Sequence, residues 1–132
     1  MRKTMVALLG VAMAVAFSVA TAPAASAITW DYTMKTTDGD PGAILKFRAH
    51  EDVVELCDLE VDGYAAWAYI DDGGSHLYPL QIGGGHNNCR QVSEKKKGKY
   101  DLDEHRYISV QVCLVKENSA AKGCREAAWY ND

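Results

Sequence analysis

The chain has 132 residues, with 14 Lys and Arg against 18 Asp and Glu, so its formal net charge is −4. This mildly acidic balance argues against nucleic acid and against an anionic membrane surface as partners. The length fits one domain that buries its own core.

The first 27 residues have the three parts of a secretory signal peptide. Arg2 and Lys3 form a short basic region, residues 5–20 are almost wholly apolar, and Ala25-Ser26-Ala27 is a small-residue cleavage site. The apolar run is shorter than the roughly 20 residues of a confident membrane span, and no basic stop-transfer segment follows it. We therefore expect a cleaved signal peptide over residues 1–27 and a single secreted, extracellular domain over residues 28–132, with no membrane contact after cleavage.

The rest of the chain alternates apolar and polar residues in short segments, with the period of a β-strand. Turn signals separate the segments, and none of ten or more residues has a helical period. In chain order the expected strands are 28–36, 43–50, 52–57, 63–70, 76–82, 106–115 and 124–130. This pattern predicts an all-β domain, a compact antiparallel β-sandwich or barrel of about seven to eight short strands.

The alternation also predicts which side chains face the core. In the first segment Trp30, Tyr32 and Met34 share one face. In the second, the inward side chains are Leu45, Phe47 and Ala49, and the outward ones are Lys46 and Arg48. Pro79 lacks a backbone N–H, which predicts that its segment lies at a sheet edge.

All four cysteines lie in the expected secreted domain, and an even number in an exported chain of this size predicts two disulfides. No pair has the short spacing of a structural zinc site. If residues 106–130 form one hairpin with its turn between Asn118 and Ser119, Cys113 lies opposite Cys124, within disulfide reach. This register predicts the pairs Cys113–Cys124 and Cys57–Cys89.

The facing pairs that this register predicts elsewhere in the hairpin can be checked for a shared apolar face. It places Ile108 opposite Trp129 and Val110 opposite Ala127, which gives one largely apolar face. Arg125 opposite Val112 is the one discordant pair.

A glycine-rich stretch, Gly-Gly-Gly-His-Asn-Asn-Cys, ends at Cys89. It lacks the lysine and the following helix of a phosphate-binding loop. We expect residues 83–85 to supply positive φ angles or a close approach to a neighbour. Asn87 and Asn88 are typical turn residues, and His86 is expected in solvent. The Cys57–Cys89 disulfide would fix this loop.

Asp58, Glu60 and Asp62, followed by Gly63, imitate the first half of a calcium-binding loop. The second half does not fit, because Tyr69 stands where a bidentate glutamate is needed. The alternative is an ordinary Asp-Gly turn between two strands. These three residues are weak calcium candidates, and we expect no cofactor. The other histidines lie near turns or strand ends without metal-binding spacing: His50, His76 and His105.

Four lysines gather in one short stretch: Lys95, Lys96, Lys97 and Lys99. Such a cluster is typical of a solvated loop or of a charged sheet edge that discourages aggregation. Binding of an anionic polymer is the less favoured interpretation.

The order of motifs resembles a group of small exported proteins from Streptomyces-type actinobacteria. The resemblance rests on Cys-Asp-x-x-x-Asp-Gly at 57–63, an aromatic-rich strand, the glycine-rich stretch before Cys89, Val-x-Val-Cys at 110–113 and a last cysteine at 124. It spans nearly the whole of residues 28–132. It implies a secreted protein with disulfides and no particular activity.

Three functions of different classes remain. The first is a non-catalytic binding module for an extracellular protein or a polysaccharide, because Trp30, Trp67, Trp129 and seven tyrosines exceed what a small core needs. We nevertheless expect Trp67 and Trp129 in the core. The second is an inhibitor of a secreted hydrolase, which would use the segment 117–124 with Lys122. The third is a small enzyme, for which no nucleophile–base pair is evident.

Overall fold

A computed structural model describes residues 27–132. The expected signal peptide, except for Ala27, lies outside the described residues. Within them, no helix has the length and apolar character needed to cross a membrane.

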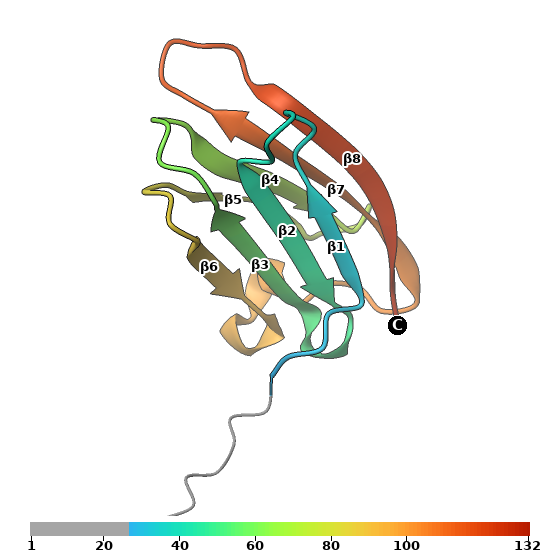
Figure 1. The fold of residues 1–132 in the computed structure, drawn as a ribbon. Coiled ribbons are helices and arrows are strands. Elements are labelled where there is room, and N and C mark those ends of the chain that lie inside the picture. The colour runs from blue at the N-terminus through green and yellow to red at the C-terminus, as the bar shows by residue number, and fades with distance from the viewer. Residues whose placement is uncertain (1–26) are drawn as a thin grey trace, which may run out of the picture.

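The described residues form two four-stranded antiparallel sheets that pack as layers (Figure 1). The first sheet has the order β1-β2-β3-β6, with β1 Tyr32–Lys35, β2 Ala43–Arg48, β3 Val53–Asp58 and β6 Asn88–Val92. The second has the order β5-β4-β7-β8, with β5 Leu77–Ile82, β4 Ala65–Asp71, β7 Arg106–Val115 and β8 Lys122–Asn131. Three short 3-10 turns are His50–Asp52, Glu94–Lys96 and Gly98–Tyr100. The predicted all-β fold is confirmed as two packed sheets.

The core lies between the sheets and takes the inward side chains of both. Leu45 and Phe47 of β2 are fully buried, as predicted, and so are Ile70 of β4 and Ile108 of β7. The alternation of β2 and β4, buried at every second residue, is the physical reason that these segments form strands with one face on the core.

An aromatic stack joins the two sheets along one side. The rings of Tyr32 on β1 and Trp129 on β8 lie 5.4 Å apart with planes 9° from parallel, and Phe47 on β2 packs against both. Trp129 is only 6% exposed, which confirms its predicted place in the core. Stacked rings of this kind add to the stabilisation from buried area.

Two other tryptophan predictions are wrong. Trp67 is half-buried on the outer face of β4, because the inward positions of that strand are occupied by Ala66, Ala68 and Ile70. Trp30 precedes β1 and does not share the inward face of Met34. Its ring lies 5.4 Å from the ammonium group of outward-facing Lys46.

The β7–β8 hairpin has the predicted register. Ile108 faces Trp129, Val110 faces Ala127, and the discordant Arg125 faces Val112. Beyond Val112 the register shifts, so that Leu114 pairs with Lys122. Arg125 remains exposed because β8 is the edge strand of its sheet.

The structure also tests the predictions for Pro79 and for the lysine cluster. Pro79 lies on β5, which is an edge strand as predicted. The lysine cluster lies in the exposed turns between β6 and β7 and in no strand, so the solvated-loop interpretation holds. One of its members, Lys95, forms an ion pair of 2.9 Å with Glu51.

Candidate functional site

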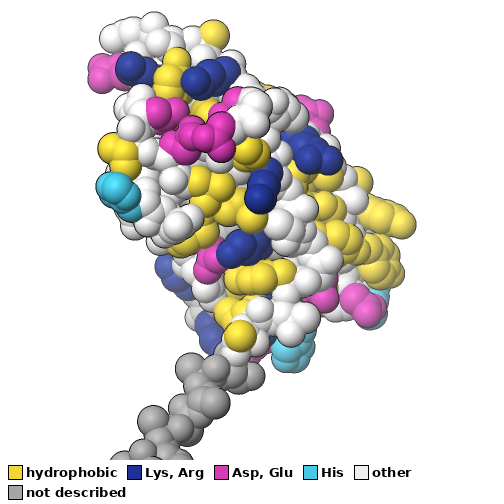
Figure 2. All heavy atoms as spheres, viewed as in Figure 1, with side chains coloured by type: hydrophobic (Ala, Val, Ile, Leu, Met, Phe, Trp, Pro, Cys, Tyr) yellow, Lys and Arg dark blue, Asp and Glu magenta, His cyan; other side chains and the backbone are white. Residues whose placement is uncertain are grey.

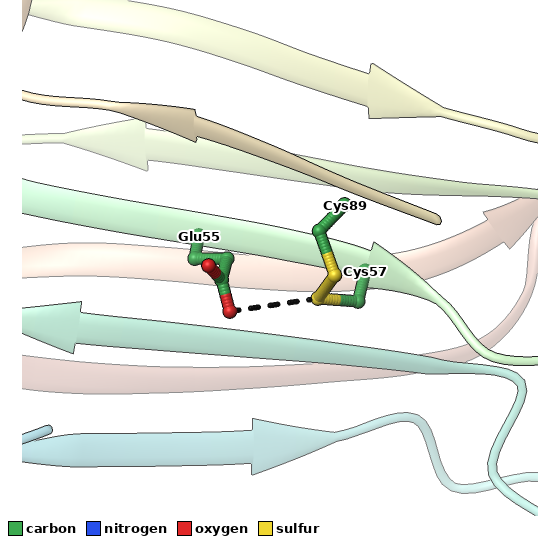
Figure 3. Close-up of side chains that lie close together, drawn as sticks. All are labelled: Glu55, Cys57 and Cys89. Atoms are coloured by element: carbon green, nitrogen blue, oxygen red, sulfur yellow. Dashed lines mark hydrogen bonds between the residues drawn. A yellow bond between two sulfur atoms is a disulfide. The ribbon is translucent and has the colours of Figure 1, made fainter. Parts of the chain in front are cut away.

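Both predicted disulfides are present, Cys57–Cys89 and Cys113–Cys124, and the described residues contain no free cysteine. Cys57 and Cys89 face each other on β3 and β6 (Figure 3). Glu55 Oε1 lies 3.6 Å from Cys57 Sγ. Because both sulfurs are bonded to each other, this group has no thiolate to offer a metal.

The glycine-rich loop is fixed by its neighbours, as the sequence indicated. The Gly85 N–H donates a hydrogen bond of 2.9 Å to the buried carboxylate of Asp58. Gly85 has a φ of +61°, and a Cβ there would lie 2.5 Å from the backbone oxygen of Glu60. Only glycine fits such an approach. His86 is exposed, as predicted, and Asn87 adopts the left-handed conformation.

The three calcium candidates occupy three different settings. Asp58 is buried and holds the glycine-rich loop. Asp62 accepts a hydrogen bond of 2.9 Å from the Tyr64 N–H within its own turn. A side-chain hydrogen bond with Asp40 raises the pKa of Glu60, and the negative charges around it act in the same direction. None of the clusters of possible metal ligands in the described part of the chain contains these candidates.

A groove of about 580 Å³ lies at this end of the molecule, between the turn after β3, the glycine-rich loop and the β7–β8 hairpin. Its aromatic residue is Tyr64, whose ring has the Lys122 ammonium 3.8 Å from its centroid and the Lys116 ammonium 5.4 Å away. Lys122, the residue expected to act in an inhibitory loop, is therefore engaged with the protein's own ring.

The opposite end is held by two buried carboxylates. Asp72 accepts hydrogen bonds from the N–H groups of Gly74, His76 and Asp103, and its Oδ2 lies 2.6 Å from His76 Nδ1. Burial alone would raise the pKa of Asp72, but these hydrogen bonds outweigh it and lower the pKa to about 2. The hydrogen bond from the Asp103 N–H links the turn between β4 and β5 to the segment that precedes β7.

Asp52 shows the reverse balance. Burial raises its pKa to about 6, against hydrogen bonds of 2.8 Å from the Leu102 N–H and from the Asn131 amide.

Among the described clusters of possible metal ligands, each contains at most one histidine, so no pair of histidines converges there.

The outer face of the second sheet carries aromatic side chains, unlike the two ends of the molecule, where charged groups predominate. Trp67 and Tyr69 project from β4 side by side, with ring centroids 6.0 Å apart and planes 15° from parallel. The paired register defines the other outward positions on this completely described sheet. They are Leu77, Pro79, Gln81, Ala65, Asp71, Tyr107, Ser109, Gln111, Cys113, Val115, Cys124, Glu126, Ala128 and Tyr130. None of them is Lys, Arg or His.

This face is hollowed beside Tyr69. The hollow has a volume of about 540 Å³, and Ser109, Gln111, Glu126 and Ala128 line it. Gln111 Nε2 donates a hydrogen bond of 2.6 Å to Glu126 Oε1 along one rim. We call Trp67, Tyr69 and this hollow the aromatic face.

A second pair of aromatic rings stands on the same side of the sheet. Tyr107 and Tyr130 meet edge to face at 5.2 Å, and Tyr107 is 68% exposed. Exposed apolar side chains are ordinary when single, but clusters of them mark binding surfaces.

The outer side of the first sheet carries charges instead, and Figure 2 shows Lys, Arg, Asp and Glu side chains scattered over that view. Lys46 Nζ and Glu55 Oε1 form an ion pair of 2.9 Å across β2 and β3. Opposite charges on facing strands are an ordinary surface solution for a solvated sheet.

Fold and surface thus define a small two-sheet, all-β protein with two disulfides and one aromatic outer face. No protein-family model, no curated protein and no solved structure matches this chain. The resemblance to small exported actinobacterial proteins therefore stays a prediction.

The aromatic face is the surface that the sequence analysis missed. The signal was present in β4, where Ala66, Ala68 and Ile70 occupy the buried positions. If those small and aliphatic residues face the core, Trp67 and Tyr69 must face outward.

Proposed function

We propose that the protein is a secreted, non-catalytic binding module and that the aromatic face is its ligand-binding surface. The observation that carries this proposal is the stacked Trp67–Tyr69 pair on an outer sheet face. Neither ring is needed to fill the core, which Phe47, Tyr78 and Trp129 already occupy. Large aromatic side chains held rigidly on a sheet are efficient binding groups because they lose little conformational entropy.

Secretion is supported by the signal-like N-terminus and by the pairing of all four cysteines. Disulfides persist in oxidising compartments. Two of them in about a hundred residues also give a surface that stays in shape outside the cell.

The test is binding by purified residues 28–132, with wild type compared with Trp67→Ala and Tyr69→Ala. The probes are a panel of insoluble polysaccharides and the proteins of the culture fluid. We expect each substitution to weaken capture by at least about tenfold, the loss typical of a central aromatic contact. Trp30→Ala is the matched control, because Trp30 is a half-buried tryptophan that precedes β1 and lies beside Lys46 of the other sheet.

The proposal is overturned if nothing in the panel is captured, or if both variants bind as wild type does. It is also overturned if Trp30→Ala reduces capture as much as Trp67→Ala.

A second candidate is inhibition of a hydrolase by the β7–β8 turn. This turn projects beyond both sheets (Figure 1) and is braced by Cys113–Cys124. Residues 116–122 are exposed, and within them the Lys116 and Lys122 ammonium groups lie over the Tyr64 ring. Inhibition of proteases and glycosidases that Glu117→Ala abolishes and Trp67→Ala leaves unchanged would favour this candidate.

A further inference from the structure

We propose that the ligand of the aromatic face is a neutral polysaccharide, with one sugar ring seated in the hollow beside Tyr69. This inference rests on the proposed function and adds the class of ligand. A pyranose has two kinds of surface, a face of C–H groups and a rim of hydroxyls. The aromatic face offers a partner for each.

The C–H face of a sugar packs on an aromatic ring. Tyr69 lines the hollow. Trp67 is two residues away on the same strand, with its ring nearly parallel and its ring centroid 6.0 Å from that of Tyr69. Tyr69 supplies the ring for the sugar unit in the hollow, and Trp67 extends the apolar surface beside it. Aromatic rings with a polar tip serve well here, because they remain partly wet and partly apolar.

The hydroxyl rim meets hydrogen-bonding groups on the far side of the hollow. Gln111 uses one amide hydrogen on Glu126 at 2.6 Å, which leaves its second amide hydrogen and its carbonyl oxygen for a ligand. Glu126 retains a further carboxylate oxygen, and Ser109 adds a hydroxyl. The Gln111–Glu126 bond orients both groups before a ligand arrives, which reduces the entropy cost of binding.

Small residues leave the space for the sugar ring. Ser109 and Ala128 face each other on β7 and β8 and line the hollow, while bulkier Gln111 and Glu126 face each other on its rim. A larger side chain at position 128 would fill the hollow without touching the core, because Ala128 points outward on an edge strand.

The charges of this face select the kind of polysaccharide. Its outward positions contain two carboxylates, Asp71 and Glu126, and no positive side chain. A uronate, sulfated or phosphorylated polymer would meet repulsion and no cation to pair with. A neutral, hydroxyl-rich chain meets no such penalty, and its binding should change little with salt because no ion pair forms.

The experiment measures binding of wild-type residues 28–132 to cellulose, chitin, xylan and β-1,3-glucan, with polygalacturonate as the anionic arm and chitosan as the cationic arm. We expect retention on at least one neutral polymer, equal at low and high salt. Ala128→Trp should weaken it by at least about tenfold by filling the hollow. The matched control is Thr33→Trp, an equally large insertion at an exposed position of β1.

The outcomes separate the two proposals. If Trp67→Ala abolishes capture of a protein or a charged polymer and no neutral polymer binds, the ligand class is wrong and the binding surface stands. If no capture depends on Trp67 or Tyr69, both are wrong. Glu126→Gln separates a neutral from a cationic ligand. The amide still forms hydrogen bonds with sugar hydroxyls, so a neutral polymer should be retained. It has no negative charge, so retention of chitosan should be lost. If the Ala128→Trp variant binds a neutral polymer as well as wild type does, the proposed sugar site in the hollow is wrong.

Discussion

The outer faces of the two sheets have the same architecture but different residues. Each belongs to a four-stranded antiparallel sheet and carries one cross-strand disulfide. The first face presents ion pairs such as Lys46–Glu55, whereas the second presents Trp67 and Tyr69 without any positive side chain. Folding constrains the inward positions of a sheet far more than the outward ones. The difference between the faces therefore points to function.

The largest expected effects come from removing the disulfide of each face in turn. Cys57→Ser with Cys89→Ser opens a loop of 32 residues and should cost about 4 kcal/mol, against about 3 kcal/mol for Cys113→Ser with Cys124→Ser, which opens one of 11. Urea unfolding measures both. The first pair should also increase amide exchange at residues 83–88, and a larger loss from the second pair would contradict the loop-length argument.

A pH titration changes the free energy of unfolding through buried carboxyl groups and leaves the side chains of both outer faces in place. The pKa of Asp52 rises from 3.8 to about 6 on folding, so the folded state holds that proton more tightly than the unfolded state. Its contribution, about 3 kcal/mol, is present in full below about pH 4 and is lost as the pH rises through 6. Asp52→Asn should remove this loss between pH 4 and 7.

Asp72 acts in the opposite direction at lower pH. Its lowered pKa, about 2, gives stability that is present above about pH 4 and disappears as the pH falls toward 2. Asp72→Asn should flatten that acid limb and leave the change between pH 4 and 7 intact. An unchanged acid limb in this variant would show that other carboxylates dominate it.

The tryptophan of each face sharpens the comparison at smaller cost. Trp67→Ala and Trp30→Ala should each reduce the free energy of unfolding by about 1 kcal/mol, because both side chains are only half-buried. Ligand binding should separate them, with loss in Trp67→Ala alone. Calorimetric unfolding and the capture assay on the same samples provide both readings.

The smallest expected effect lies in the Lys46–Glu55 pair. A double-mutant cycle with Lys46→Ala and Glu55→Ala should give a coupling of about 0.5 kcal/mol that shrinks at high salt. A coupling well above 1 kcal/mol would mean that the charged face is also a specialised surface.

The sequence predicted the β7–β8 register because two independent constraints agree there. Strand periodicity places Ile108 and Val110 inward, and the cysteines at 113 and 124 allow one facing alignment. Strand β6 was not predicted, since Val92 is its only buried residue and no alternation marks it. It becomes a strand by pairing with β3, a long-range contact without a local signal.

The site was less predictable than the fold. Trp67 was assigned to the core by residue type, although the small residues beside it indicated the opposite face. The hollow could not be predicted, because Tyr69, Gln111 and Glu126 come from three strands and meet only in the folded sheet. The same holds for Asp52, whose partners Leu102 and Asn131 are 50 and 79 residues away.

Pro79 has a consequence for how this protein behaves when concentrated. An unpaired edge strand beside an exposed aromatic surface is a template for fibre growth. Pro79 removes a hydrogen-bond donor from the middle of β5, and the register shift after Val112 disrupts β8 on the other side. The β5 margin of the second sheet therefore offers no unbroken ladder to a neighbouring copy. The β8 margin is interrupted at its start, and farther along the Tyr130 N–H is already bonded to the Tyr32 hydroxyl. Both features make it harder for the exposed aromatic rings to nucleate aggregates.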